Sequence, residues 1–502
     1  MSIKIYPVHD VAQQCADYEV KINGQVVKAD TARVSAVPFN RRWPGHQRQI
    51  EQSELVNFVS FACEGETVLE IIPKKKFENV VVRPTSLGLN PEILADGTIK
   101  IVLNKPEYFT VEPYGRKKAL HIFADPMPQY QVGQDEDVLY FGSGLHEVGM
   151  LNLKSNQTVF IDEGAVVFGC IHATDAENIR IIGRGILDNS HNKEEILFDI
   201  NAEENSMDVG NAKRLHTIQL EYCTNIEIDG ITIRDSLVYN VRPIGCKNLT
   251  IKNVKIIGCW RFNSDGIDMH NCEHVRISDC FLRTFDDSIC VKGFDLYNAE
   301  DVEAATREAI YHNGEVYDCF KDVIVNNCTI WNDWGKCLEI GAETKAKEIC
   351  DIVFKNCNII HVCHGALTCS NGDYADVHDV TYENIHVEYD NEIPAPRLQA
   401  KDAEIYENKD LDYTPHLIAV GIYYYEEYSR GVVQRGINRD ITFKNIYLYG
   451  RQKPTLCFEG YDAAHLCSNI LVEKLYWNGE RVTSFDDGQI TMNEYCKNIR
   501  IL

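Results

Sequence analysis

"CTNIEIDGITIRD" (223–235) and "CKNLTIKNVKIIG" (246–258) are two copies of one short sequence pattern. Each copy opens on polar residues, continues with alternating apolar positions, turns at Gly, Asn or Asp, and alternates again. Alternation with a period of two is typical of a half-buried strand. Each copy therefore predicts short strands joined by a turn.

The pattern recurs from about residue 150 onward, most often at intervals of 23 to 29 residues. The first apolar residues of ten copies are Ile179, Ile226, Leu249, Val275, Val323, Ile352, Val380, Ile441, Ile470 and Ile499. Repeats of short strands at a fixed period predict a solenoid, here a parallel β-helix. A β-propeller needs blades of about 40–45 residues, which is too long a period. A β-sandwich would fit single segments but not ten aligned copies.

The cysteines fit this arrangement. Cys223, Cys246 and Cys272 each stand three residues before the first apolar residue of a copy, so they predict a ladder of small buried side chains. The chain has 19 cysteines, an odd number, and we find no CxxC pair with zinc spacing. We therefore expect the cysteines to be reduced thiols in a cytosol, and we predict no metal ion and no cofactor.

Residues 1 to about 125 lack the repeat and show alternating segments such as "TVLEIIP" (67–73) and "TIKIVL" (98–103). These segments predict an antiparallel β-sandwich. The stretch 124–137 is rich in Pro, Gly and charge, as linkers are. We predict an all-β protein with an N-terminal β-sandwich domain at 1–130 and a β-helix domain at 137–502.

The composition limits the partners. A formal net charge of −25 argues against nucleic acid and anionic membranes, because phosphate binding needs a concentrated basic surface. Residues 1–30 have no long apolar run behind a basic start, and no later stretch approaches the roughly 20 apolar residues that span a bilayer. We expect a soluble, cytoplasmic protein. Its oligomeric state stays open, homo-oligomers included.

Three aspartates stand out within the repeats. Asp265 and Asp286 are 21 residues apart, close to one coil, and Asp287 follows directly. Stacked carboxylates repel each other, so an Asn or Ser ladder would be the safer choice for stability. Grouped acids separate into one with a raised pKa and one that is ionised, which suits proton transfer. Asp268, in "GIDM", is instead expected in a turn or a buried hydrogen bond.

"NSDGID" (263–268) followed by "DDSICVKG" (286–293) resembles the paired motifs of glycoside hydrolase family 28, the polygalacturonase-like enzymes. The fold of that family is a right-handed parallel β-helix. The related family 49, dextranases and isopullulanase, has a similar acidic trio and adds an N-terminal β-sandwich. The resemblance covers most of 137–502. It implies that Asp286 is the general acid, and that Asp265 and Asp287 hold and deprotonate the attacking water, with inversion at the anomeric carbon.

The same resemblance implies substrate contacts downstream. Lys292 matches the lysine of the second motif, and "WGKCLEIGAE" (334–343) is similar to a later family segment, with Gly341 and Glu343 aligned. The histidine of that segment is replaced, since Gly and Lys stand at 335 and 336. The predicted substrate-binding residues are Asn263, Lys292, Trp334, Lys336, Glu339 and Glu343.

The substrate prediction rests on a departure from the family. Pectin-cleaving members grip a galacturonate carboxylate with a basic pair, but the corresponding stretch here, "GALTCSNGD" (365–373), has no Arg or Lys. With the acidic net charge, this favours a neutral oligosaccharide or polysaccharide. Hydrolysis of pectic galacturonides, a β-helix polysaccharide lyase and a non-catalytic carbohydrate-binding protein are the alternatives. Long insertions at 295–318 and 388–415 favour exo attack.

Overall fold

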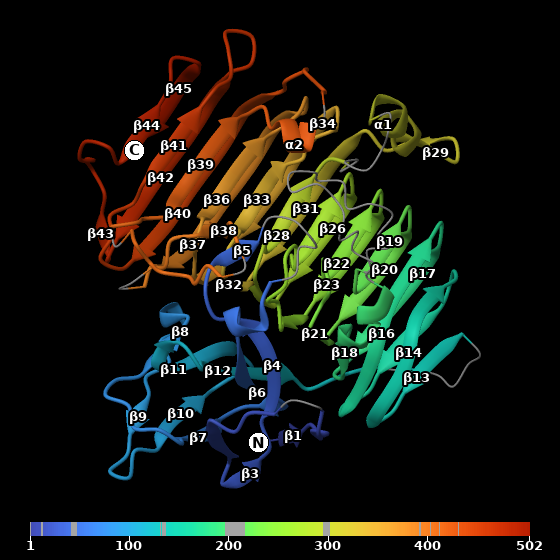
Figure 1. The fold of residues 1–502 in the computed structure, drawn as a ribbon, viewed down its shortest axis with the longest axis vertical. Coiled ribbons are helices and arrows are strands. Elements are labelled where there is room, and N and C mark those ends of the chain that lie inside the picture. The colour runs from blue at the N-terminus through green and yellow to red at the C-terminus, as the bar shows by residue number, and fades with distance from the viewer. Residues whose placement is uncertain are drawn as a thin grey trace.

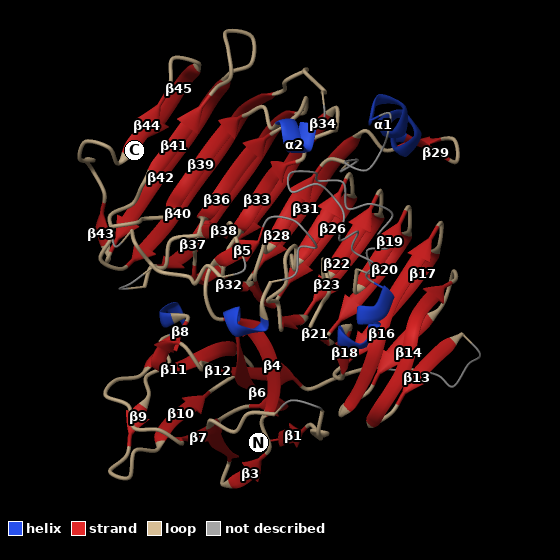
Figure 2. Cartoon of the chain, in the orientation of Figure 1, coloured by secondary structure: helices blue, strands red, loops and turns tan. Residues whose placement is uncertain are grey.

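The computed structural model shows two sheets at the N-terminus beside a long coil of parallel strands (Figures 1 and 2). It describes residues 2–11, 14–41, 48–130, 132, 137–195, 216–294, 302–390, 393–401, 403–410, 412–429 and 431–502. Among these residues no helix has the length and apolar character needed to cross a membrane. Part of each insertion that suggested exo attack, 295–301 and 391–392 included, lies outside the described residues.

Two sheets make up the N-terminal sandwich. Its six-stranded sheet runs β1-β6-β12-β11-β8 with β4 on β6, and its five-stranded sheet runs β3-β2-β7-β10-β9. Their bounds are β1 (Ser2–Ile5), β2 (Tyr18–Ile22), β3 (Gln25–Val27), β4 (Asp30–Ser35), β6 (Ser53–Glu64), β7 (Thr67–Pro73), β8 (Val81–Arg83), β9 (Glu92–Ile93), β10 (Ile99–Leu103), β11 (Tyr108–Arg116) and β12 (Leu120–Pro126). Most pairs are antiparallel, but β12 and β6 run parallel. The limits 1–130 and 137–502 stay a prediction.

Within the described residues thirty strands form one sheet. All but β43, which pairs antiparallel with β42, build the right-handed parallel β-helix, and each full coil contributes one strand to each of three faces. Face 1 holds β13 (Val138–Phe141), β15 (Thr158–Ile161), β17 (Glu177–Gly183), β20 (Thr224–Asp229), β23 (Lys247–Lys252), β26 (Glu273–Ser278), β31 (Cys319–Asn326), β34 (Glu348–Lys355) and β45 (Cys496–Ile501). Face 2 holds β18 (Ile186–Asp188), β21 (Thr232–Arg234), β24 (Lys255–Ile257), β27 (Phe281–Thr284), β32 (Thr329–Asn332) and β35 (Asn358–His361). Face 3 holds β19 (Ile218–Glu221), β22 (Val241–Ile244), β25 (Ile267–His270), β28 (Ile289–Lys292), β33 (Lys336–Ala342), β36 (Gly365–Asn371), β39 (His416–Ile422), β41 (Leu456–Glu459) and β44 (Ile490–Met492).

Long strands bend from one face to the next. They are β14 (Gly144–Leu153) and β16 (Ala165–Thr174) between faces 2 and 3, and β37 (Asp376–Glu388), β40 (Ile437–Tyr449) and β42 (Cys467–Trp477) between faces 1 and 2. The remaining short elements are β5 (Phe39–Arg41), β29 (Tyr311–His312), β30 (Glu315–Val316), β38 (Arg397–Gln399), β43 (Glu480–Arg481), α1 (Val302–Ile310), α2 (Glu426–Ser429), and the 3₁₀ turns at Ile50–Gln52, Thr85–Leu87 and Ser190–Glu195.

The repeat found in the sequence is the stacking unit of the coil. Ile226, Leu249 and Val275 are register partners on face 1, and all three are buried in the central core. Asn225 and Asn248 precede the first two of them at φ of 59° and 58°, a left-handed conformation that asparagine tolerates. Their side chains are also linked, because the Asn248 amide donates to Asn225 Oδ1 at 3.1 Å. The prediction of a parallel β-helix is confirmed.

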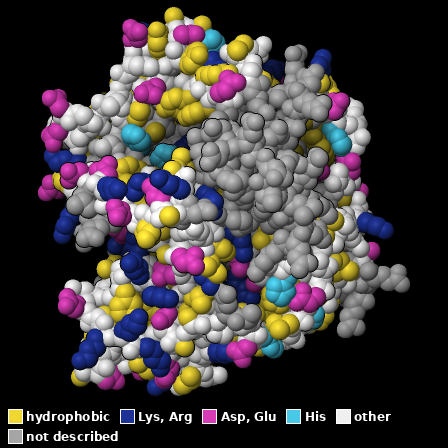
Figure 3. Space-filling model, in the orientation of Figure 1, with side chains coloured by type: hydrophobic (Ala, Val, Ile, Leu, Met, Phe, Trp, Pro, Cys, Tyr) yellow, Lys and Arg dark blue, Asp and Glu magenta, His cyan; other side chains and the backbone are white. Residues whose placement is uncertain are grey.

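Face 2 packs against the N-terminal six-stranded sheet through apolar side chains. Val34, Phe58 and Phe123 from that sheet share one core cluster with Phe281 and Trp331 of the coil. Basic and acidic side chains are interspersed over the solvent side of the N-terminal sheets (Figure 3). The sandwich therefore covers one side of the coil and leaves face 3 to carry the acidic motifs.

Candidate active site

Two neighbouring coils bring the three predicted acids together on face 3. Asp265 precedes β25, while Asp286 and Asp287 form the turn between β27 and β28. Because β25 pairs in parallel with β28, the two turns lie side by side. One carboxylate oxygen from each of Asp265, Asp286 and Asp287 lies within 4.8 Å of the other two. The structure thus places the trio in one cluster, as the sequence predicted.

Two asparagines that the sequence analysis missed hold these turns. Asn240 Nδ2 donates to the backbone carbonyl of Asp265 at 2.6 Å, and Asn332 Nδ2 donates to that of Asp286 at 2.7 Å. Both asparagines are fully buried, so each carbonyl is fixed from the neighbouring coil. Their sequence signal is slight, since asparagine is also the ordinary turn residue of these repeats.

Lys292 lies among the acids. Its Nζ is 2.8 Å from Asp268, 3.5 Å from Glu343, 3.6 Å from Asp287 and 3.9 Å from Asp265, measured to the nearest carboxylate oxygen. Burial disfavours its charge, but Asp268 and Glu343 outweigh burial and raise the pKa of Lys292 well above the ordinary value. Asp268 lies inside β25 rather than in a turn, and its partner is this ammonium.

The carboxyls of the trio differ in environment. Asp265 is 2% exposed, while Asp286 and Asp287 are half-buried. Burial raises the pKa of Asp265 well above its usual range, and the charges of Asp268 and Asp286 add to it. Burial, with Asp287 beside it, does the same to the pKa of Asp286. Carboxyls that keep their protons here can act as acids.

Lys336 and Glu339 of β33 extend the site toward the C-terminal coils. The backbone N–H of Lys336 donates to Asp287 Oδ1 at 2.9 Å, and its Nζ pairs with Glu339 and donates to Ser370 Oγ at 3.0 Å. Ser370 lies in "GALTCSNGD", the stretch that lacks a basic residue. The ammonium of Lys336, which lies one coil earlier, therefore contacts the stretch 365–373, which has no Arg or Lys of its own. Burial raises the pKa of Glu339 to about 7.

The other predicted residues lie at the margin of the cluster. Trp334 is half-buried, with its ring stacked on Phe285 at 5.9 Å between centroids. Asn263 is half-buried in the turn before β25, with φ of 52°. Below Phe285, the Arg48 guanidinium of the N-terminal region lies 3.7 Å from the ring centroid, a support that nothing in the sequence indicates. Direct sugar contacts of Trp334 and Asn263 stay a prediction.

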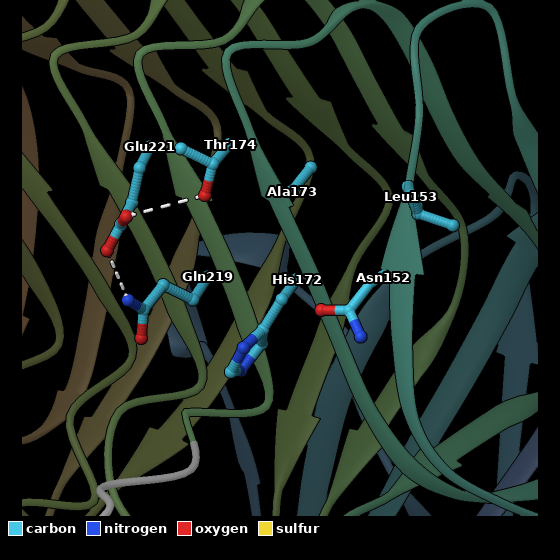
Figure 4. Close-up of a pocket in the computed structure, with 7 residues that line it drawn as sticks. All are labelled: Asn152, Leu153, His172, Ala173, Thr174, Gln219 and Glu221. Atoms are coloured by element: carbon cyan, nitrogen blue, oxygen red, sulfur yellow. Dashed lines mark hydrogen bonds between the residues drawn. The ribbon is translucent and has the colours of Figure 1, made fainter.

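A cavity of about 310 Å³ lies on face 3 in the coils that precede the trio. Asn152, His172, Gln219 and Glu221 line it with polar groups (Figure 4), and the Gln219 amide donates to Glu221. Strands β16 and β19 carry His172 and Gln219, and only β22 separates β19 from β25. The cavity is therefore in line with the acids along the coil axis.

The family model of "Glycosyl hydrolases family 28" matches residues 135–393, over half of the 502 residues. The chain belongs to glycoside hydrolase family 28. The matched range contains the acidic trio, Lys292, Lys336 and Glu343, so the residues that carried the resemblance lie inside the family region.

Family 28 relatives match the chain in part. Over 86 residues it is 36% identical to a probable polygalacturonase of Vitis vinifera, which is 17% of this chain and 18% of that protein. Over 285 residues it is 25% identical to a polygalacturonase of Gossypium barbadense, covering 46% of this chain and 67% of that protein. The first match thus spans less than a fifth of the Vitis protein.

Solved structures share the fold. Dex49A from Penicillium minioluteum superposes with a TM-score of 0.54 at 15% identity, over 99% of this chain and 96% of that one. A hyperthermoactive exopolygalacturonase from Thermotoga maritima gives a TM-score of 0.52 at 16% identity, over 73% of this chain and 83% of that one. At these identities the likeness is one of fold.

Proposed function

We propose that this family 28 chain hydrolyses glycosidic bonds of pectic galacturonides, with inversion at the anomeric carbon. The observation that carries the proposal is the cluster of Asp265, Asp286 and Asp287 within 4.8 Å, beside the half-buried ammonium of Lys336. The cluster supplies both a proton donor and a proton acceptor. Lys336 supplies a cation for a sugar carboxylate.

In this mechanism Asp286 enters the reaction protonated, as its burial favours, and gives its proton to the leaving glycosidic oxygen. Asp287 and Asp265 hold a water, and Asp287 removes its proton as the water oxygen attacks the anomeric carbon. Asp265 Oδ1 is buried and makes no hydrogen bond within the described part of the chain, which leaves a lone pair for that water. Asp286 loses one proton to the leaving oxygen, and Asp287 gains one from the water. Proton exchange with solvent then returns both carboxyls to their starting state.

Lys292 offsets part of the negative charge of this cluster. Its ammonium lies within 4 Å of one oxygen from each of four carboxyl groups, which lowers the repulsion between them. The same charge opposes a divalent cation at the trio, which weighs against a calcium-dependent lyase.

The substrate assignment reverses the neutral-glycan expectation. The relatives that match the chain are named polygalacturonases, and Lys336 occupies the position of the family histidine while contacting Ser370. A buried, charge-assisted contact from an ammonium to a carboxylate is the interaction that a galacturonide requires. The cavity lined by His172 and Gln219 would hold further sugar units of the same chain.

The stereochemistry rests on the family rather than on the carboxylate spacing. Inverting glycosidases usually separate their carboxyls by about 6.5–9.5 Å and retaining ones by about 5–5.5 Å. Oxygens within 4.8 Å fit the shorter class, so separation alone does not select inversion here. Proton NMR of the first-formed product, taken before mutarotation, distinguishes the two outcomes.

The decisive test is a panel of galacturonide and neutral oligosaccharides assayed for new reducing ends. We expect release from galacturonides with inverted anomeric configuration and no new absorbance from an unsaturated product. Release only from neutral glycans would restore the earlier substrate prediction. An unsaturated product whose formation a chelator stops would identify a lyase.

We also propose a cytoplasmic location. All 19 cysteines are unpaired, and most are buried in the coil, as in proteins of reducing compartments. Substrates would then be short imported galacturonides, because long polymers do not enter a cytosol. Fractionation of cells that express the chain with its own termini tests this placement.

A further inference from the structure

A second group of metal-ligating side chains lies on face 1, away from the acidic trio. Glu348 and Cys350 of β34 and His378 of β37 each place one ligand atom within 4.8 Å of the other two. Cys350 and His378 are register partners, and so are Cys319 of β31 and Glu348. Cys319 Sγ lies 4.0 Å from Glu348 Oε2. We propose that Cys319, Glu348, Cys350 and His378 bind one zinc ion.

The donor set selects the metal. Two thiolates, one imidazole and one carboxylate offer the sulfur and nitrogen atoms that zinc prefers, and four ligands complete its tetrahedral shell. Zinc bonds are about 2.3 Å to sulfur and about 2.0–2.2 Å to nitrogen and oxygen. The ligand atoms of Glu348, Cys350 and His378 span at most 4.8 Å and reach these lengths by closing about one ångström, a side-chain movement. Cys319 joins them through its 4.0 Å contact with Glu348.

His378 is already oriented as a metal ligand. Its Nε2 faces Glu348 Oε1 at 2.8 Å, while its Nδ1 lies 2.7 Å from Asp379 Oδ2. Zinc-binding histidines usually give their second ring nitrogen to a carboxylate, which fixes the tautomer and strengthens the ligand. His378 is 8% exposed and Cys350 is 5% exposed, so the imidazole ring and the sulfur atom are shielded from competing water.

The surroundings favour a cation over free thiolates. Asp318 Oδ1 lies 3.3 Å from Cys319 Sγ, and Asp351 Oδ2 lies 3.7 Å from Cys350 Sγ. Both carboxylates add negative charge beside the thiols, which favours a bound cation.

Nearby basic side chains are engaged elsewhere. Lys321 lies 3.4 Å from Glu273, and Arg439 makes contacts of 3.0 and 2.9 Å with Asp376. The carboxylates of Asp318 and Asp351 therefore add negative charge beside the thiols. An ion at this site would fasten three consecutive coils, because its ligands come from β31, β34 and β37. That origin also explains why the sequence shows no CxxC signature.

Cobalt titration of the full chain, after treatment with a chelator, tests the proposal. We expect one equivalent of Co²⁺ to bind with sulfur-to-metal absorption and tetrahedral bands, and Zn²⁺ to displace it and raise the melting temperature. Cys350→Ser and His378→Asn should each weaken binding at least tenfold, and Asp379→Asn should weaken it less.

Two controls separate this site from others. Cys496→Ser removes a half-exposed thiol elsewhere, and Cys290→Ser removes the thiol of the Asp287–Cys290–Glu339 group beside the trio. Both should bind Co²⁺ as the native chain does. Absence of sulfur-to-metal absorption in the native chain, or unchanged binding in folded Cys350→Ser and His378→Asn, would overturn the proposal. If these two variants do not fold, half-exposed Cys319→Ser gives the same test.

Discussion

Among the buried clusters of charged side chains in the described residues, two are balanced differently. The first, at the junction of the sandwich and face 2, has four carboxylates and four basic groups: Glu112, Asp333, Glu388 and Asp390 with Arg83, Arg116, Arg283 and His361. The second, on face 3, gathers the trio, Asp268 and Glu343 around Lys292. Four carboxyl groups there lie within 4 Å of one ammonium, and Asp286 completes the trio.

The balance decides how protons are held. At the junction, His361 lies 2.8 Å from Asp390 and 2.9 Å from Glu112, and it lowers the pKa of both carboxyls against the effect of burial. On face 3, burial and like charges raise the pKa of Asp265 and Asp286. A paired cluster destabilises the fold strongly when one partner is removed, because a buried charge is left uncompensated. An underpaired cluster keeps protons available for chemistry, at a cost in stability.

The largest effect is expected for Asp286→Asn. Removing the proton donor should lower kcat for galacturonides about 10²–10⁴-fold. The melting temperature at pH 7 should hold or rise, because the substitution removes a carboxyl whose charge is disfavoured. That gain should vanish toward pH 4, since a raised pKa contributes stability at low pH that is lost as pH rises. Asp487→Asn, at an exposed position, is the control for the loss of one charge. If Asp286→Asn lowered stability as much as Asp390→Asn at the junction, the contrast between the two clusters would be wrong.

Asp390→Asn should have the opposite profile. Breaking a buried pair leaves its basic partners uncompensated, at a cost of about 3–5 kcal/mol of unfolding free energy. Denaturant unfolding at pH 7 measures this cost, and kcat of the folded fraction should stay near the native value. Because the pKa of Asp390 is lowered, its contribution is present above the unfolded value of about 3.9 and lost as pH falls. Loss of activity without loss of stability would contradict this assignment.

The coil was predictable from the sequence because each stacked coil needs an apolar residue at the same core positions. Ile226, Leu249 and Val275 recur at the coil period since each must fill the same core position. The trio was predictable because acids at that period conflict with stacking. The partners of these residues were not predictable. Arg48 and Asn332 approach the Asp286 turn from distant parts of the chain, and only the fold shows which segments meet.

The comparisons favour the galacturonide alternative over the neutral-glycan prediction, and the reason is similar. That prediction looked for a basic residue within 365–373, whereas Lys336 reaches Ser370 from the previous coil. A side chain that bridges coils has no fixed offset in sequence. The proposed zinc site could not be predicted from sequence spacing for the same reason, because Cys319 and Cys350 belong to different coils.

Lys336→Met tests the proposed carboxylate contact. A hydrogen bond to a charged group contributes about 1.5–3 kcal/mol, so KM for galacturonides should rise about 10- to 150-fold, with a smaller change in kcat. Lys336→Met combined with Glu339→Gln is the matched control for an unpaired Glu339. Equal losses on neutral and galacturonide substrates would show that Lys336 supports Asp287 rather than the sugar.

The smallest effect concerns pH and links the two halves of the comparison, because Glu339 is a carboxyl that one ammonium only partly compensates. Burial raises its pKa to about 7, whereas Lys336 keeps its proton throughout the working range. Below pH 7 Glu339 is neutral, and the Lys336 charge is free to attract a galacturonate. Above pH 7 the Glu339 carboxylate competes for that charge and repels the substrate. KM for galacturonides should therefore rise several-fold between pH 6 and pH 8 in the native chain. In Glu339→Gln the KM profile should be flat while the kcat profile, set by the trio, keeps its shape. A KM that rises equally in both would remove Glu339 from substrate binding.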